Sequence, residues 1–92
     1  MSFKGHIVLV TGGASGMGAA CVKGFTDAGA QVFIIDRDEA AANRVMEQAA
    51  ASGVFIGDVS DSTFCDRTAA SILEQSERID VLINAAGVIA RH

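Results

Sequence analysis

Three glycines near the start of the chain have the spacing of a loop that binds phosphate. Gly12, Gly16 and Gly18 follow a continuous apolar run, 7–10, and stand where a helical pattern begins. The first glycine permits a tight turn, the second lets backbone approach a pyrophosphate, and the third lets the helix pack closely on the strand. The amides and the positive dipole end of that helix can then hold phosphate without a lysine. An ordinary glycine-rich turn is the alternative, and the strand, the helix and an acid further along the chain argue against it.

That acid is Asp36, which ends the second apolar run, 31–36, about 20 residues beyond the glycine loop. Its carboxylate can accept hydrogen bonds from both hydroxyls of a ribose, whereas a 2′-phosphate about 4 Å away would be repelled by about 1–4 kcal/mol. Asp36 therefore favours NAD over NADP. Arg37 keeps NADP open, because an arginine beside this position can bind a 2′-phosphate. The alternative for Asp36 is a solvated acid at a strand end.

Other reactive side chains are expected to have no chemical role. Ser15 is expected to cap the helix or touch phosphate rather than act as a nucleophile, because no histidine lies near it in the pattern. His6 and His92 are expected to be exposed bystanders. Cys21 and Cys65 are expected to be reduced core thiols, because their separation fits neither a metal site nor a disulfide framework.

Strand and helix patterns alternate along the whole chain, as βαβαβαβ. This order predicts an α/β fold, an incomplete Rossmann-type doubly wound parallel sheet with right-handed crossovers and strand order 3-2-1-4. In that order the carboxyl ends of the first and fourth strands form the crevice where open α/β sheets bind ligands. The expected strands are 7–10, 31–36, 54–56 and 79–83. The expected helices are 16–28, one from its cap Asp38 to about Ser52 with Gly53 as the stop, and one capped by Ser60 or Asp61 that ends near Ser76, with Phe64, Thr68, Ala69, Ile72 and Leu73 facing inward.

The motifs at the strand ends together resemble the short-chain dehydrogenase/reductase family. The glycine loop, Thr11-Gly12-Gly13-Ala14-Ser15-Gly16-Met17-Gly18, matches the family pattern TGxxxGxG, and it is followed by Asp36, Asp58-Val59 and Asn84-Ala85-Ala86-Gly87. The resemblance covers the whole chain and implies the main dehydrogenase branch. It also implies that Asp58 bonds the adenine amino group and that Val59 lies against the adenine ring.

The last motif departs from the family pattern NNAG at one position. Ala85 replaces the second asparagine, which leaves the strand-stabilising role of Asn84 intact and removes one polar contact. Gly87 would let backbone approach a ribose, although Asp58 or Gly87 alone would be interpreted as a turn former. No metal ligands are expected. The expected cofactor-binding residues are Gly12, Ser15, Gly16, Met17, Gly18, Asp36, Arg37, Asp58, Val59, Asn84, Ala85, Ala86 and Gly87.

The residues that would carry out the reaction are not found in the sequence. Family members use a serine, a tyrosine and a lysine, the last two as Tyr-x-x-x-Lys, but this chain has no tyrosine. The resemblance therefore implies that residues 1–92 are the N-terminal NAD-binding part of an oxidoreductase that interconverts a secondary alcohol and a ketone by hydride transfer. By itself this part should be inactive. A non-catalytic NAD(P)-binding module and an unstable truncated product are the alternatives.

The composition excludes several other classes of partner. A net charge of −4 argues against nucleic acid and anionic membrane, which both require a basic face. The apolar run 7–10 is too short for a signal-peptide core or a membrane-spanning helix, so a cytoplasmic location is expected. The fourth strand would be an apolar edge, which suggests missing chain. The complete enzyme is expected to act on a small-molecule alcohol or ketone and to form a homo-oligomer.

Overall fold

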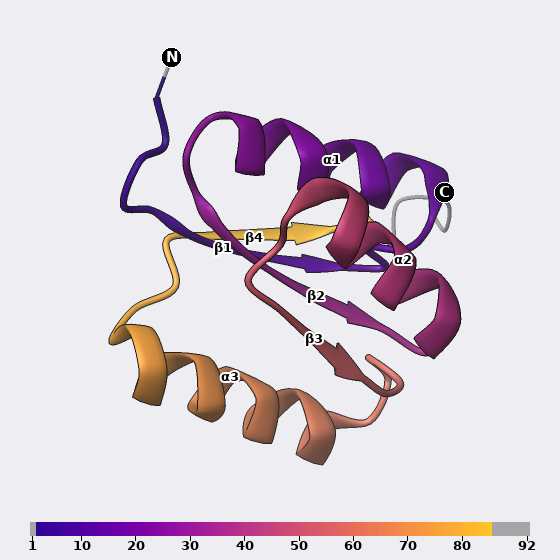
Figure 1. The fold of residues 1–92 in the computed structure, drawn as a ribbon. Coiled ribbons are helices and arrows are strands. Elements are labelled where there is room, and N and C mark those ends of the chain that lie inside the picture. The colour runs from indigo at the N-terminus through magenta and orange to yellow at the C-terminus, as the bar shows by residue number, and fades with distance from the viewer. Residues whose placement is uncertain (1, 86–92) are drawn as a thin grey trace, which may run out of the picture.

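The computed structural model describes residues 2–85, and four parallel strands form its centre (Figure 1). The sheet has the order β3-β2-β1-β4, so the predicted fold class and strand order are confirmed. The elements in chain order are β1 (Ile7–Thr11), α1 (Gly16–Asp27), β2 (Gln31–Asp36), α2 (Glu39–Ala49), β3 (Gly53–Ile56), α3 (Ser62–Ser76) and β4 (Val81–Asn84).

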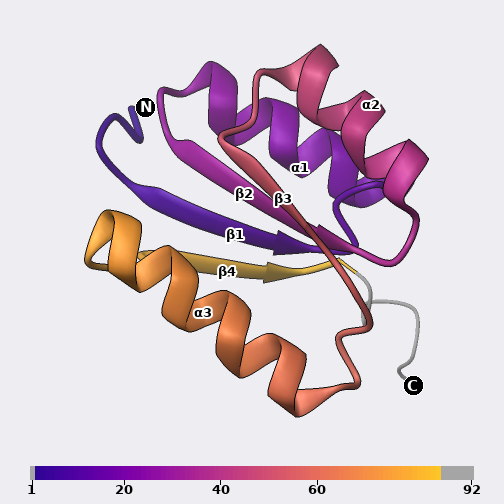
Figure 2. The same ribbon diagram turned by 60° about the horizontal axis from the view of Figure 1, so that its bottom comes forward.

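Helices cover both faces of the sheet. Helices α1 and α2 lie on one face and α3 lies on the other (Figures 1 and 2). Successive strand residues point to opposite faces, so a strand covered on both sides must be apolar throughout. Val8, Val10, Val32 and Ile34 belong to the core cluster with α1 and α2. Ile7, Leu9, Phe33 and Ile35 belong to the cluster with α3.

The central strand β1 lies where the chain changes direction across the sheet. It pairs with β2 on one side and with β4 on the other. Helix α1 connects β1 to β2 over one face, and α3 leads into β4 over the other face (Figure 2). The connection that leaves β1 and the one that enters its neighbour β4 therefore lie on opposite faces, the arrangement in which open α/β sheets form a crevice at the carboxyl ends of their strands.

The second helix ends earlier than predicted. It stops at Ala49, and Ala50 takes the left-handed conformation with a φ of 58°. The chain has rejoined the sheet by Ser52, whose amide donates to the Val32 carbonyl at 2.7 Å. Gly53 is therefore a strand residue and not the helix stop. A Cβ there would lie 3.1 Å from the Phe33 ring, which explains a glycine at this position.

Two details of the third helix and the fourth strand also differ. Asp61, not Ser60, caps α3, since its carboxylate accepts from the amides of Thr63 and Phe64. Leu73 was expected to face inward, but it is 45% exposed. Ile72 is buried, and adjacent helix positions point about 100° apart, so the next residue turns away from the sheet.

The fourth strand begins at Val81 rather than at Ile79. Asp80 precedes the ladder, with its amide bonded to the Ile7 carbonyl at 2.8 Å. Ile79 packs against the core cluster on the α3 side. The strand is an edge of the sheet, and Leu82 at its middle is exposed.

Two predictions about isolated side chains are wrong. His6 is half-buried rather than exposed, because its ring packs edge-on against Phe3 with ring centroids 5.3 Å apart. Both cysteines are free, and Cys21 packs against the core as predicted. Cys65, however, lies outside the core clusters and directs its thiol to the Val59 carbonyl. His92 lies outside the described residues.

Within residues 2–85, none of the helices is long and apolar enough to cross a membrane. The same residues contain no cluster of side chains that could hold a metal ion.

Candidate functional site

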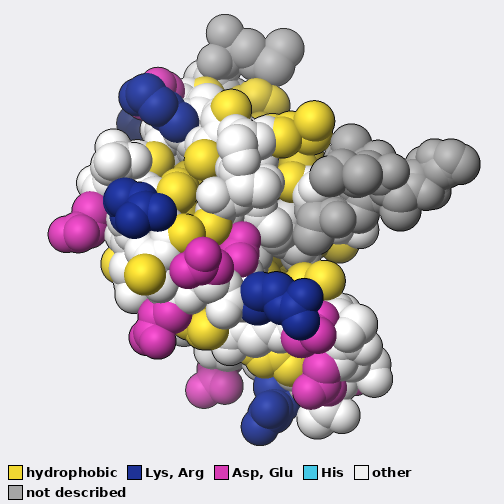
Figure 3. Space-filling view, turned by 90° about the vertical axis from the view of Figure 1, so that its right-hand side faces the viewer, with side chains coloured by type: hydrophobic (Ala, Val, Ile, Leu, Met, Phe, Trp, Pro, Cys, Tyr) yellow, Lys and Arg dark blue, Asp and Glu magenta, His cyan; other side chains and the backbone are white. Residues whose placement is uncertain are grey.

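A pocket of about 540 Å³ lies at the carboxyl ends of the strands. Figure 3 looks onto this side of the molecule, where apolar side chains are exposed among acidic and basic ones. Nine of the predicted cofactor-binding residues line it, together with two residues that the sequence did not single out. The lining residues are Gly12, Ser15, Gly16, Met17, Ile35, Asp36, Arg37, Gly57, Asp58, Val59 and Ala85.

The glycines of the loop have three different surroundings. Gly12 has a φ of +71°, which a side chain would disfavour. A Cβ on Gly18 would collide with the carbonyl oxygen of Gly12, so close approach of α1 to the loop requires glycine. A Cβ on Gly16 would meet nothing within 4 Å. The position of Gly16 at the pocket wall is therefore not explained by packing within the described chain.

The first turn of α1 presents unused backbone donors to the pocket. Ser15 is the N-cap: its hydroxyl accepts from the Gly18 amide at 3.0 Å and donates to the Gly12 carbonyl at 2.8 Å. Within residues 2–85, no group accepts from the amides of Gly16 and Met17. Such amides at the positive end of a helix bind anions well.

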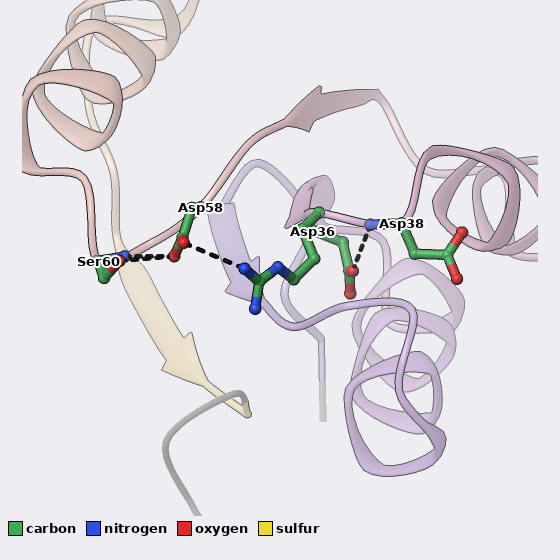
Figure 4. Close-up of polar contacts among 5 residues, drawn as sticks. Asp36, Asp38, Asp58 and Ser60 are labelled. Atoms are coloured by element: carbon green, nitrogen blue, oxygen red, sulfur yellow. Dashed lines mark hydrogen bonds and ion pairs between the residues drawn. The ribbon is translucent and has the colours of Figure 1, made fainter.

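Asp36 is tied to the glycine loop by its carboxylate. One oxygen accepts from the Ala14 amide at 3.0 Å. The other accepts from the Asp38 amide at 3.0 Å (Figure 4). Each carboxylate oxygen can accept more than one hydrogen bond, so both retain capacity toward the pocket. Ala14 was not singled out from the sequence, because its contribution is a backbone amide that any residue would supply.

Asp58 is oriented by Ser60. The backbone amide and the hydroxyl of Ser60 donate to Oδ1 of Asp58 at 2.9 and 2.8 Å (Figure 4). Oδ2 accepts from Arg37 Nη2 at 3.2 Å, in an ion pair whose side chains are 77% and 46% exposed. The Ser60 amide, then its hydroxyl and then Arg37 lower the pKa of Asp58, against an opposing effect of burial. Asp58 is therefore a carboxylate near neutral pH.

Apolar groups complete the pocket wall. Met17 and Val59 are large apolar side chains that remain exposed there. Ile35 and Gly57 also line the pocket but were missed from the sequence. A Cβ on Gly57 would lie 2.5 Å from the Phe64 ring, so this glycine lets the segment after β3 pass close to α3. A signal for it exists, since it stands between a short apolar run and Asp58.

The segment after β4 is joined to β1. The Thr11 hydroxyl donates to the Asn84 side-chain oxygen at 3.0 Å, and the Ala85 amide donates to the Thr11 carbonyl at 3.0 Å. Ala85 is buried and lines the pocket, whereas Asn84 and Gly18 support the site from outside the lining. Ala86 and Gly87 lie outside the described residues.

Comparison with known proteins places these features in a family. A family model described as short chain dehydrogenase matches residues 6–92. L-fucose dehydrogenase of Mus musculus is 41% identical over 86 residues, which cover 92% of this chain and 31% of that protein. Short-chain dehydrogenase reductase 5 of Arabidopsis thaliana is 36% identical over 90 residues, which cover 96% of this chain and 35% of that protein.

Solved structures agree with this assignment. The 3-ketoacyl-(acyl-carrier-protein) reductase from Brucella melitensis complexed with NADH has a TM-score of 0.81 and 33% identity, over 88% of this chain and 34% of that one. A metagenomic short-chain oxidoreductase in complex with NADP has a TM-score of 0.83 and 28% identity, over 89% and 39%. The chain spans about a third of the length of the curated relatives it matches. It belongs to the short-chain dehydrogenase/reductase family.

Proposed function

We propose that residues 1–92 form the N-terminal, NAD-binding part of an oxidoreductase that interconverts a secondary alcohol and a ketone by hydride transfer. The observation that carries the proposal is the hydrogen bond from the Ala14 amide to Asp36. It joins the start of α1, which suits phosphate, to a carboxylate that suits a ribose, and both line one pocket.

The pocket residues fit the parts of a dinucleotide in order. The free amides of Gly16 and Met17, next to the Ser15 cap, would hold the pyrophosphate, and the open space above Gly16 would let it approach. Asp36 would accept from the hydroxyls of the adenosine ribose, and Val59 would lie against the adenine. Asp58 would accept from the adenine amino group. Backbone after β4, at Asn84, Ala85, Ala86 and Gly87, would lie near the second ribose.

We propose NAD rather than NADP as the cofactor because of Asp36. A 2′-phosphate about 4 Å from this carboxylate would be repelled by about 1–4 kcal/mol, whereas ribose hydroxyls would be bonded by it. The named neighbours include complexes with NADH and with NADP, so the family as a whole uses both.

The nicotinamide of the bound cofactor would supply the hydride chemistry, and this segment would bind and orient it. The sequence has no tyrosine, so a Tyr-x-x-x-Lys pair must come from elsewhere in the protein if it acts as the family does. We therefore expect residues 1–92 alone to bind NADH without turnover. We propose a small alcohol or ketone as substrate of the whole protein.

Two matched glycines on α1 test the binding mode. A Cβ on Gly16 or on Gly24 would meet nothing within 4 Å, but Gly16 lines the pocket and Gly24 does not. In the protein at its natural length, Gly16→Ala should raise the Kd for NADH roughly tenfold, as overpacking a contact surface costs about 1–3 kcal/mol. Gly24→Ala should leave the Kd unchanged. Equal effects of both changes, or no NADH binding by the wild type, would contradict the proposal.

The alternative proposal is a dinucleotide-binding module without catalysis. Intact mass of the protein from its natural source separates the two functions. A mass near the 9.5 kDa of residues 1–92 would favour the module, and a much larger mass with alcohol-dependent reduction of NAD would favour the enzyme.

A further inference from the structure

We propose that Asp58 is a positioning residue for cofactor choice: by pairing with Arg37 it withholds that arginine from a 2′-phosphate and so strengthens the preference for NAD. The inference rests on the proposed function and extends it. In this proposal the two acids at the pocket have different roles: Asp36 accepts hydrogen bonds from the ribose, and Asp58 binds the guanidinium of Arg37.

Arg37 is the cation that could reverse the preference. It follows Asp36 directly in the sequence and lines the same pocket. Neither oxygen of Asp36 bonds it; both accept from backbone amides, those of Ala14 and Asp38. Its guanidinium instead reaches from the end of β2 to Asp58, beyond the end of β3, at 3.2 Å. The arginine beside the ribose site is thus already paired with an anion.

Asp58 is held ready for this pairing by its own loop. Both donors of Ser60 bond Oδ1, which leaves Oδ2 to face Arg37. These bonds fix the carboxylate without help from Arg37. The arginine, which has no other hydrogen bond within the described part of the chain, is therefore the partner that moves if the pair opens.

The Arg37–Asp58 ion pair is weak enough for Arg37 to exchange Asp58 for a phosphate, but it still competes with the 2′-phosphate for the arginine. Ion pairs between exposed side chains contribute little to stability, whereas an arginine can bind a phosphate through two parallel hydrogen bonds. NADP would have to open the Arg37–Asp58 pair and also accept the repulsion of Asp36. Removing the charge of Asp58 would release Arg37 and lower one of these two barriers.

The experiment compares two ligands that differ only by the 2′-phosphate. We would measure the Kd of NADPH and of NADH by fluorescence titration of the protein at its natural length and take their ratio. Asp58→Asn keeps a side-chain oxygen for Ser60 and for adenine, so effects on the adenine contact cancel in the ratio. The ratio should fall roughly three- to tenfold. Asp66→Asn, which removes the same charge from an exposed position on α3, should leave the ratio unchanged.

A second background shows whether Arg37 carries the effect. In Arg37→Gln, the further change Asp58→Asn should not alter the NADPH to NADH ratio. An equal fall in this background would mean that Asp58 acts through its own charge, and an unchanged ratio in the single variant would mean that the pair has no role. Either result overturns the inference while NADH binding leaves the proposed function standing. A wild type that binds neither nucleotide overturns both.

Discussion

An arginine–aspartate pair lies at each end of the parallel strands, one at their amino ends and one at their carboxyl ends. The two pairs have different hydrogen-bond partners. At the amino ends of the strands, Asp80 Oδ2 accepts from Arg78 Nε at 2.9 Å and from the Ile7 amide at 2.7 Å. Arg78 also donates to the Gly5 carbonyl at 2.6 Å. This pair therefore joins the approach to β4 to the start of β1, across 73 residues of sequence.

At the carboxyl ends of the strands, the Arg37 and Asp58 side chains bond no backbone of residues 2–85 outside their own loops. Its backbone donor is Ser60, two residues from Asp58, and its side chains are 77% and 46% exposed, compared with 58% and 25% for Arg78 and Asp80. At the amino ends, the arginine and the aspartate thus bond the backbone at and before the start of β1. At the carboxyl ends, the same two residue types are more exposed to solvent. The difference fits the role proposed for the pocket pair, and close backbone packing, such as that of Gly18 on Gly12, holds the carboxyl ends together.

The largest effect should come from that packing. Gly18→Ala would drive a Cβ into the Gly12 carbonyl, so α1 must move away from the loop. We expect a loss of about 3 kcal/mol in the free energy of unfolding, measured by urea denaturation, together with loss of NADH binding. Gly24→Ala is the control on the same helix. A stable Gly18→Ala protein with normal NADH affinity would show that the close approach of Gly18 to the Gly12 carbonyl does not stabilise the carboxyl ends of the strands.

The next effect should separate the two pairs by stability. Asp80→Asn removes the charge that accepts from Ile7 and Arg78, and a buried amide is then left with a weaker partner. The melting temperature should fall more than in Asp58→Asn, while the Kd for NADH stays as in the wild type. A larger loss of stability in Asp58→Asn would reverse the comparison.

Acid should test the contribution of Asp80 to stability. The Ile7 amide and, less strongly, Arg78 lower the pKa of Asp80 below its ordinary value of 3.8, against the effect of burial. A group with a lowered pKa in the folded state stabilises the fold fully above the unfolded pKa, and this contribution is lost as the pH falls through the lower folded value. Stability should therefore decline below about pH 3.8. The decline should be shallower in Asp80→Asn than in the wild type, and parallel curves would contradict this role.

The smallest effect concerns the orientation of Asp58. Ser60→Ala removes one of the two donors to Oδ1, so the pKa of Asp58 should rise toward its ordinary value. Carboxyl titration by NMR measures this change, and Ser62→Ala, at the start of α3, is the control. NADH affinity should weaken only slightly. An unmoved pKa would show that the Ser60 amide alone orients the carboxylate.

The sequence predicts most of the fold because its signals are local. Continuous apolar runs mark strands buried on both faces, and the positions of Gly12 and Asp36 at the pocket follow from their places at strand ends. Ala50 shows the limit of local rules, because a helix ended there on a residue with no preference for the left-handed conformation. The inward orientation predicted for Leu73 is wrong because the apolar stripe of α3 is wider than the helix face that the sheet covers.

The site was less predictable because its contacts are long-range. The bond from Ala14 to Asp36 uses a backbone amide, which leaves no mark in the sequence. Arg37 and Asp58 are 21 residues apart and meet only because β2 and β3 are neighbours with parallel ends. Predicting such a pair requires both the strand order and the geometry of the loops, and a sequence motif specifies neither of these.

The position of β1 at the centre of the sheet has a consequence for how the chain acquires its shape. One side of β1 pairs with β2 after a single helix, but the other side pairs with β4, which follows the other three strands of residues 2–85 in the order of synthesis. Closing a loop of this length costs entropy before any contact offsets it, so the β1–β4 ladder should form late. On the ribosome, the apolar flank of β1 stays unpaired until 81–84 emerge, and exposed apolar surface of this kind favours aggregation. Pulsed hydrogen exchange during refolding should protect the amides between β1 and β2 before those between β1 and β4.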